Sequence, residues 1–300
     1  MEAKVFRSLL AFVMSLAHPP RGPRRLFCDR WIIMVYLWSV INDRPVSWAC
    51  REENWPKDLL DRPLPSCSAM SRRLRSVGVL QLIERVLIAL ADVQHMPLVK
   101  TIDSKPLLVG AYSKDRDATR GRIAARLFAR GYRLHSVFHG RSVRCWTLAP
   151  MKQHDSEVAP QLLEKLAGGG GYAVGDNAYD TNKCHEHAAR ANHQLIAPPR
   201  AVNREVRDAK YNLPERLRAL DMLASPLEKC GKINGFGVSI YNYRESAESA
   251  FGELTIRGLN YLPAWVRGPR RAALWTSGKL ILHNHRCLKR QRLRATVAKG

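Results

Sequence analysis

The chain has 300 residues, 46% of them hydrophobic, which is enough for two modest domains with apolar cores and is not the composition of a disordered chain. Its formal net charge of +23, from 49 Lys and Arg against 26 Asp and Glu, favours nucleic acid as a partner over an anionic membrane surface or a role in solubility alone. Seven scattered cysteines without a Cys-x-x-Cys pair argue against zinc and disulfide frameworks and predict a reduced, cytoplasmic protein.

Residues 1–95 are expected to form an all-α module, because proline-rich joints separate helical patterns and almost no alternating strand pattern occurs. Near its start, apolar residues recur at helical spacing, which favours a packed helix over a cleaved leader peptide: Phe6, Leu9, Leu10, Val13 and Leu16. The apolar run 31–41 would span only about half of a bilayer core, so we expect a buried helix and no membrane partner.

Within this module, residues 64–77 are a candidate DNA-contacting helix. Ser68 is its expected N-cap, followed by an inward stripe of Met70, Leu74 and Val77. Three arginines lie off that stripe and are predicted to contact DNA phosphate: Arg72, Arg73 and Arg75. A solvated surface helix has the same pattern, so this alternative stays open.

From residue 98 the pattern changes to short β-rich runs. Strands are expected at 98–102, 132–138, 143–148, 172–175 and 194–197, with a helix over 155–167. This order predicts a mixed sheet flanked by helices, an α/β fold. After Glu253 the chain has many basic residues and no acidic one, so residues 263–300 are expected to form a basic helical tail that follows a nucleic-acid backbone.

Three carboxylates stand out from this pattern. Asp103 and Asp176 are each placed at the end of a predicted strand, although either one alone would usually be a turn former or a helix cap. Glu248 lies in a polar segment, 241–253, that is expected to be helical, where it shares one face with Tyr241 and Arg244. An ordinary Arg–Glu ion pair is the alternative. Carboxylates brought together without a cation repel one another, so their convergence predicts a metal site.

These residues resemble the DDE transposases of bacterial insertion sequences, in the branch whose last motif reads Tyr, two residues, Arg, three residues, Glu, six residues, Lys. Tyr241, Arg244 and Glu248 match the first three letters. The middle motif of that branch matches residues 176–179, and Asp103 after an apolar strand matches the first. Asp176 lies 73 residues after Asp103, and Glu248 lies 72 residues after Asp176.

The resemblance covers about residues 64–285 and departs from the motif at one position. Thr255 stands where the family has Lys, and the nearest basic residue is Arg257. This difference puts the last phosphate contact of the motif in question.

The resemblance implies a ribonuclease-H-like catalytic core over residues 96–262, between the N-terminal all-α module and the basic C-terminal tail. By analogy, Asp103, Asp176 and Glu248 would hold two Mg²⁺ ions, with Mn²⁺ as a substitute, and Tyr241 and Arg244 would hold DNA phosphate. The implied activity is metal-dependent cleavage of double-stranded DNA at insertion-sequence ends, followed by strand transfer into target DNA. Such enzymes commonly act as homodimers on paired ends.

Two other functions compete with this one: a decayed or domesticated transposase that only binds DNA, and a metal nuclease that cuts without joining. Other acids compete for the third carboxylate, since helix phase alone separates them: Asp180, Glu245 and Glu253. Two histidine-containing groups are interpreted as polar surface residues rather than metal ligands: Cys184, His185 and His187, and His283 with His285.

Overall fold

The computed structural model describes residues 1–17, 26–91, 97–124, 126–166, 169–200, 207–224 and 236–297. Its contacts divide the chain into two compact units, Met1–Val93 with Leu274–Gly300, and Gln94–Ala273. The segment expected to be a C-terminal tail is therefore grouped, from residue 274, with the N-terminal residues. None of the described helices is both long and apolar enough to cross a membrane.

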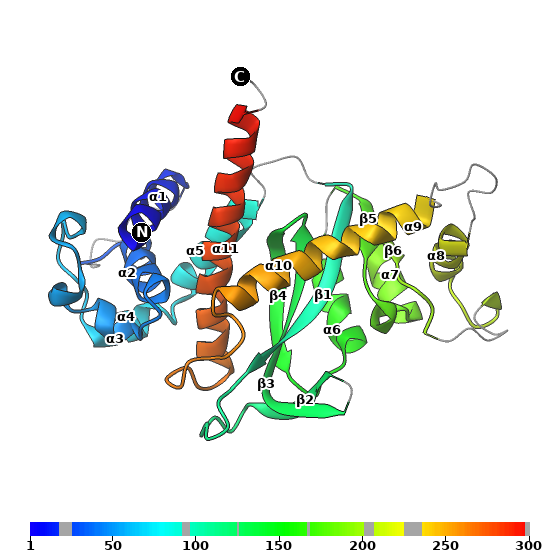
Figure 1. Cartoon of the computed structure of the whole chain (residues 1–300), viewed down its shortest axis with the longest axis horizontal. Helices are drawn as coiled ribbons and strands as arrows, with labels where there is room; N and C mark the ends of the chain where they lie inside the picture. Colours follow the sequence, from blue (N-terminus) through cyan, green and yellow to red (C-terminus); the bar gives the residue numbers. More distant parts are fainter. Residues whose placement is uncertain are drawn as a thin grey trace. The chain divides into compact units, whose positions relative to one another are not determined.

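The described part of the first unit is helical, as predicted (Figure 1). Its elements are α1 (Glu2–Ser15), α2 (Asp29–Ile41), α3 (Val46–Ala49), η1 (Glu52–Asn54), η2 (Lys57–Leu59), α4 (Cys67–Arg73), α5 (Val77–Ala91) and most of α11 (Pro269–Val297). The apolar run at 31–41 lies in α2, which is almost wholly buried. Aromatic rings pack beside it, with Trp38 stacked on Trp55 at 5.0 Å and edge-on to Phe6 at 5.5 Å between ring centroids.

The details around α4 differ from the prediction. Ser66, not Ser68, is the N-cap, and its hydroxyl accepts a hydrogen bond from the amide of Ala69 at 3.2 Å. Met70 is buried as expected, but Val77 is 68% exposed. The reason is that the helix ends at Arg73 and a second helix begins at Val77, so one helical phase does not extend over the whole segment.

The C-terminal helix is formed as predicted, but most of it is not a solvated tail. Residues 272–288 of α11 are largely buried, and exposed side chains dominate only from residue 292 onward. Gly278 explains the close approach to α2, because a Cβ there would lie 2.3 Å from the hydroxyl of Tyr36. Asn284 donates to the carbonyl of Leu87 at 3.2 Å. The apolar residues between the basic ones account for this burial, which the basic residues alone do not predict.

The second unit is built on a six-stranded sheet of β1 (Val99–Leu108), β2 (Thr119–Ala124), β3 (Leu127–His139), β4 (Ser142–Pro150), β5 (Gly171–Val174) and β6 (His193–Ile196). The order is β2-β3-β1-β5-β6, and β4 also pairs with β3. β3 is antiparallel to β1, β2 and β4, whereas β1, β5 and β6 run parallel. The predicted mixed α/β fold is therefore confirmed.

Two features of the sheet depart from the expected strands. β2 was not predicted, because its sequence, TRGRIA, has no run of apolar residues. The prediction that Asp103 ends a strand is also wrong, because β1 continues to Leu108 and pairs with β3 as far as Gly131. Backbone pairing with β3 extends β1 through the polar residues 103–105. The pattern of side chains does not predict this extension.

Helices cover both faces of this sheet (Figure 1). On one face, α6 (Asp155–Glu164) and α7 (Asn182–Arg190) pack in a cluster that includes Ile102, Leu162 and Leu195. The other helices of this unit are α8 (Pro214–Ala224), α9 (Phe236–Tyr241) and α10 (Glu245–Ile256), with the 3-10 turns η3 (Asn177–Tyr179) and η5 (Asn242–Arg244). α10 lies across β1, and Phe251 meets Phe138 of β3 edge-on at 4.9 Å between ring centroids.

Candidate active site

The register between β1 and β5 brings the first two predicted acids together. The last aligned pair of these parallel strands is Thr101 with Val174. Asp103 and Asp176 each follow two residues later. β5 ends at Val174, whereas β1 continues past Asp103 to Leu108, so Asp103 lies within β1 beside the point where the chain leaves β5 toward Asp176.

A glycine allows the chain to turn directly after β5. A Cβ on Gly175 would lie 2.6 Å from the ring of Tyr179, so a larger residue would displace the turn. Asp176 caps η3 by accepting a hydrogen bond from the amide of Ala178 at 2.8 Å. The capping role that any aspartate can have at a strand end is therefore present here, but it uses only one carboxylate oxygen.

Among the residues that the structure describes, neither aspartate has a cationic partner in direct contact. Asp103 accepts a hydrogen bond from the amide of Ser104 at 2.8 Å, just as Asp176 accepts one from Ala178. Within the described part of the chain, neither carboxylate forms a salt bridge. Both carboxylates thus keep oxygen lone pairs available for a ligand.

The third predicted acid lies on α10, where the expected face is formed. Arg244 Nη2 lies 3.1 Å from Glu248 Oε1, and Arg244 Nη1 donates to the hydroxyl of Tyr241 at 3.2 Å. The three residues belong to α9, η5 and α10, so a 3-10 turn interrupts the single helix that was expected. The Glu248 side chain is 57% exposed, and solvent screening makes this ion pair a weak contribution to stability.

Burial dominates the electrostatics of the two aspartates. It raises the pKa of Asp103 to about 6, against the opposing effects of the Ser104 amide and the Arg244 charge. Burial likewise raises the pKa of Asp176, opposed by the Ala178 amide. The negative charge of Asp176 raises the pKa of Asp103 further.

The three carboxylates are not gathered tightly. In the regions that the structure describes, they do not form a group whose oxygen atoms all lie within 4.8 Å of one another. Arg244 contacts Glu248 and its charge also acts on Asp103 and Asp176. The positive charge of Arg244 is therefore within range of all three acids.

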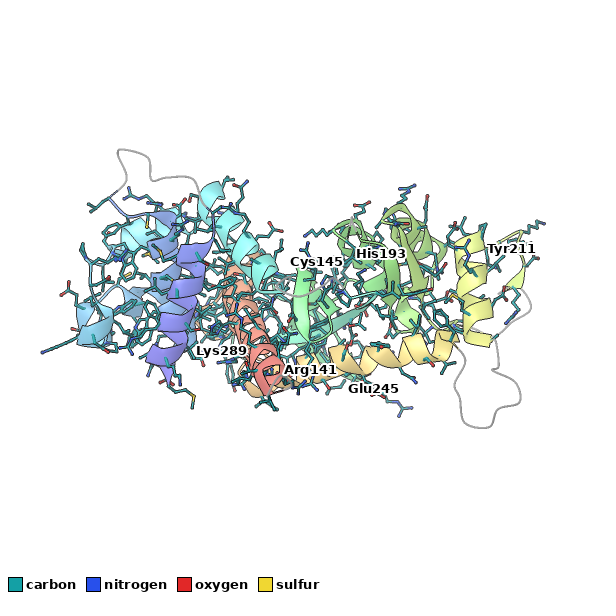
Figure 2. The ribbon with its side chains drawn as sticks, turned by 90° about the horizontal axis from the view of Figure 1, so that it is seen from above. Arg141, Cys145, His193, Tyr211, Glu245 and Lys289 are labelled. Carbon is teal, nitrogen blue, oxygen red and sulfur yellow. The ribbon has the colours of Figure 1, made fainter. Side chains whose placement is uncertain are left out.

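The competing acids have other partners or positions. Asp180 is buried and accepts from Arg216 at 2.7 and 2.8 Å. Glu253 accepts from Arg141 at 3.0 Å. Glu245, the first residue of α10, is exposed on the outer side of the helix (Figure 2). Within the described residues, Arg244 is ion-paired with Glu248 and with none of these three acids.

A fourth acid near the site was missed by the sequence reading. Asp155 begins α6, and its Oδ1 lies 3.5 Å from both Arg133 Nη1 and His135 Nδ1. Its charge contributes to raising the pKa of Asp103 and Asp176. The sequence marked residue 155 only as the start of a helix, where an acid is expected for its interaction with the helix dipole. No pattern along the chain linked it to residues 103 and 176.

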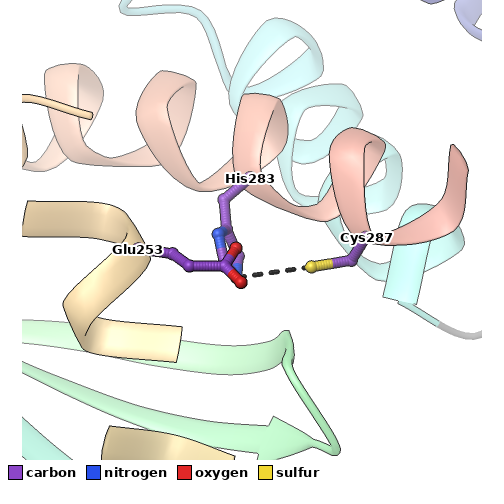
Figure 3. Close-up of side chains that lie close together, drawn as sticks. All are labelled: Glu253, His283 and Cys287. Atoms are coloured by element: carbon purple, nitrogen blue, oxygen red, sulfur yellow. Dashed lines mark hydrogen bonds between the residues drawn. The ribbon is translucent and has the colours of Figure 1, made fainter. Parts of the chain in front are cut away.

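The cysteine and histidine groups are not on the surface, contrary to the prediction. Cys184 is fully buried, and His185 is 1% exposed because it lies against Asp180 at 3.4 Å. In α11, His283 and Cys287 are also buried, and the Nε2 and Sγ atoms of this pair are 3.5 Å apart, one turn along the helix (Figure 3). The burial of the helices that carry these residues was not foreseen.

Thr255, where the resemblance expected Lys, is in contact with a lysine from another element. The Lys105 ammonium of β1 donates to Thr255 Oγ1 at 2.5 Å and lies 3.5 Å from Asn260 Oδ1. Burial lowers the pKa of Lys105. A positive charge therefore reaches the end of α10 from β1, two residues after Asp103.

The three arginines of the predicted DNA-contacting helix differ in their surroundings. Arg73 points into the first unit, where it donates to the carboxylate of Asp29 and to the carbonyl of Phe27. Arg72 and Arg75 are exposed. Their contact with DNA remains a prediction.

Comparison with known proteins agrees with this arrangement. The family model described as "Transposase DDE domain" matches residues 92–285, more than half of the chain. The chain belongs to this family of DDE transposases. The cryo-EM structure of a piggyBac transposase synaptic complex with hairpin DNA is similar, with a TM-score of 0.51 and 11% identity over 98% of this chain and 73% of that chain. At that identity the likeness shows the fold, which is consistent with a ribonuclease-H-like core for the transposase. No curated protein matches the chain.

Proposed function

We propose that this transposase cuts double-stranded DNA at the ends of a bacterial insertion sequence and joins the freed ends to target DNA. The principal support is the pair of partly buried aspartates, Asp103 in β1 and Asp176 directly after the neighbouring strand β5, which form no salt bridge within the described residues. Even partial burial of a charge without a partner is unfavourable, so such a pair is retained for binding or catalysis more readily than for stability. Glu248 of α10 is the third proposed acid.

The donor set fits a hard divalent cation. Asp103, Asp176 and Glu248 would offer carboxylate oxygens, the ligands that Mg²⁺ and Mn²⁺ prefer. Two such ions about 3.5 to 4 Å apart supply the charge that activates an attacking water and stabilises a leaving oxygen. Binding would require Glu248 to exchange its contact with Arg244 for the ions, which its exposed position permits.

Arg244 is then free to hold phosphate. Its planar guanidinium suits two phosphate oxygens, and the hydroxyl of Tyr241, 3.2 Å away, fixes its orientation. The DNA strand would thereby be positioned beside the carboxylates. Neither residue is proposed to transfer a proton.

The reaction has two phosphoryl transfers. In the first, a water oxygen bonds to phosphorus, the bond from phosphorus to the 3′ oxygen breaks, and a 3′ hydroxyl and a 5′ phosphate result. In the second, that 3′ hydroxyl attacks a target phosphate, loses its proton, and releases the target's own 3′ hydroxyl. The chain's contribution is to align the strand and to gather negative groups where cations are required.

The first unit is proposed to bind DNA outside the cleavage site, and two copies are proposed to act on paired ends. Arg72 and Arg75 are exposed on and just after α4 and offer two phosphate contacts. The net charge of +23 supports a polyanion such as DNA as the partner.

The test is metal-dependent nicking of a plasmid that carries the DNA flanking the gene. Wild-type protein should nick with Mg²⁺ or Mn²⁺ and not with EDTA, and a labelled 3′ end should appear in joined products. Asp103→Asn should lower the rate to below about one hundredth while DNA binding persists. Asp221→Asn, which alters an aspartate that is 70% exposed on α8, is the matched control and should cut normally. Full activity of Asp103→Asn would remove it from the site.

A second candidate is a DNA-binding protein that has lost cleavage, which is favoured by Thr255 at the position of the family's lysine. It predicts tight DNA binding without metal-dependent nicks. The contact from Lys105 to Thr255 argues for the first candidate, because it supplies a cation at the same end of α10.

A further inference from the structure

The β2–β3 hairpin presents an unusual row of positive charge. Between residues 111 and 130, the exposed charged side chains are six basic residues and one acid, Asp117. The basic residues are Lys114, Arg116, Arg120, Arg122, Arg126 and Arg130. Within the described ranges, none of the six forms a salt bridge. Asp115, the other acid in this stretch, is buried, and it accepts from the hydroxyl of Tyr132 at 2.9 Å.

Strand register places part of this charge on one face. Arg120 lies opposite Arg130, and Arg122 lies opposite Phe128. Directly opposed residues of an antiparallel pair point to the same face, and residues two apart in a strand do so as well. One face of the hairpin therefore carries three guanidinium groups and an aromatic ring. The Arg120 guanidinium lies over that ring, 5.9 Å from its centroid.

The opposite face of the hairpin is covered. Gly121 and Gly131 lie on it, and a Cβ at Gly121 would be 2.4 Å from the carbonyl oxygen of Met151. Lys152, just after β4, donates its amide to Thr119 Oγ1 at 3.3 Å. The arginine face is thus the one left open to a partner.

Like charges directly opposite each other destabilise a sheet. The Arg120 and Arg130 pair has no acid among its described contacts to offset this cost. An anionic partner with repeated charges would offset it. The exposed Phe128, which is 52% accessible, adds an apolar surface beside the charges.

The hairpin is connected to the candidate active site through one arginine. Arg133 Nη2 donates to the carbonyl of Arg122 at 2.7 Å, and Arg133 Nη1 donates to Ser104 Oγ at 3.3 Å. Ser104 follows Asp103 in β1. Register also places Asp103, which lies opposite Ser136 of β3, on the same face of the sheet as Arg130, because residues 130 and 136 are an even number of positions apart in one strand. A duplex on the arginine face can therefore continue along that face toward Asp103.

We propose that the arginine face of the β2–β3 hairpin, formed by Arg120, Arg122, Phe128 and Arg130, binds the phosphate backbone of duplex DNA next to the cleavage site. The inference rests on the proposed function for the nature of the partner. Contacts to phosphate position DNA and do not read its sequence. The face therefore holds duplexes of any sequence equally.

The test compares two full-length double variants with the same loss of charge. Arg120→Gln with Arg122→Gln removes two contacts from the face, and Arg130 is left intact because it donates to the carbonyl oxygens of Ala118 and Asp115. Lys165→Gln with Lys183→Gln, at exposed positions outside the hairpin, is the control. Binding to a random-sequence duplex is measured by fluorescence anisotropy across a salt series, with thermal melting to confirm folding.

We expect the hairpin variant to lower the slope of log affinity against log salt by about two and to weaken binding about a hundredfold near 0.1 M salt. The control should change the slope by less than half as much. Equal slopes for wild type and hairpin variant would overturn the proposal. The proposal would also be overturned if the hairpin variant lost binding to anionic phospholipid vesicles while its DNA binding stayed unchanged. The partner of this face would then be a membrane.

The result of this DNA-binding test can be distinguished from the result of the cleavage test. If wild-type protein fails to nick DNA but the hairpin variant loses salt dependence, the proposed function fails and this interface stands. If wild-type protein nicks DNA and the hairpin variant keeps the wild-type slope, only the interface fails.

Discussion

Two aspartates four residues apart have opposite electrostatic environments. Asp180 is buried with Arg216 and His185, and although burial alone would raise its pKa, their hydrogen bonds outweigh it and hold the pKa at about 2. Asp176 is partly buried and has no such partner among the described residues, and burial raises its pKa. The comparison teaches that burial alone does not distinguish a structural acid from a functional one. The presence of a bound cationic side chain does.

The largest expected effect is a difference in cleavage activity between variants of Asp176 and variants of Asp180. Asp176→Asn should reduce plasmid nicking more than about a hundredfold, because it removes a proposed cation ligand, while leaving the melting temperature unchanged or higher. Asp180→Asn should cut at the wild-type rate per folded molecule. A normal nicking rate for Asp176→Asn would show that the unpaired acid has no role in the reaction.

The second effect is a loss of folding stability, which is expected for Asp180 and not for Asp176. Asp180→Ala leaves Arg216 and His185 without their carboxylate, and breaking a buried pair in this way costs about 3 to 5 kcal/mol. Urea unfolding at pH 7 should show a loss of that size, against a change below about 1 kcal/mol for Asp221→Asn at an exposed site. If both variants unfold at the same urea concentration, the Asp180 network is not structural.

The third effect concerns pH. The pKa of Asp180 falls from 3.8 to about 2 on folding, so its stabilisation is complete above pH about 4 and is lost as the pH falls through about 2. This amounts to about 2 kcal/mol. The stability difference between wild type and Asp180→Asn should therefore shrink between pH 4 and pH 2. A difference that stays constant over this range would contradict the assignment.

The smallest effect concerns the end of α10. Thr255→Lys introduces the lysine of the motif that residues 241–248 resemble but places a second ammonium against Lys105, so we expect a loss of about 1 kcal/mol and no gain in nicking rate. Lys105→Thr combined with Thr255→Lys should recover the stability, because one charge is again present. Faster nicking by the single variant would show that a lysine at 255 acts independently of Lys105.

The sequence predicted the fold class, but it did not predict where every strand begins and ends or how deeply each helix is buried. Periodicity located five strands and the main helices, since each of these buries apolar residues on a regular face. β2 and the second half of β1 escaped because they are specified by pairing with β3 rather than by their own side chains. The burial of α11 escaped because basic residues were weighed more heavily than the apolar ones beside them.

For the candidate site, spacing could identify residues that share an element but not residues that meet across elements. Tyr241, Arg244 and Glu248 were aligned correctly because helical phase is a local property. Asp155 was missed, since its position near Asp103 depends on how α6 packs on the sheet. The contact from Lys105 to Thr255 joins residues 150 apart in the chain, and no local pattern predicts such a contact.

The first unit is discontinuous in sequence, with Met1–Val93 completed by Leu274–Gly300. During synthesis, the whole of Gln94–Ala273 leaves the ribosome before α11 can join α2, so the helices of the N-terminal segment must wait for their last partner. Nascent chains stalled before residue 274 should therefore carry a protease-resistant sheet unit and a protease-sensitive N-terminal segment. The order of translation thus places completion of the proposed DNA-binding unit after completion of the unit that holds the carboxylates.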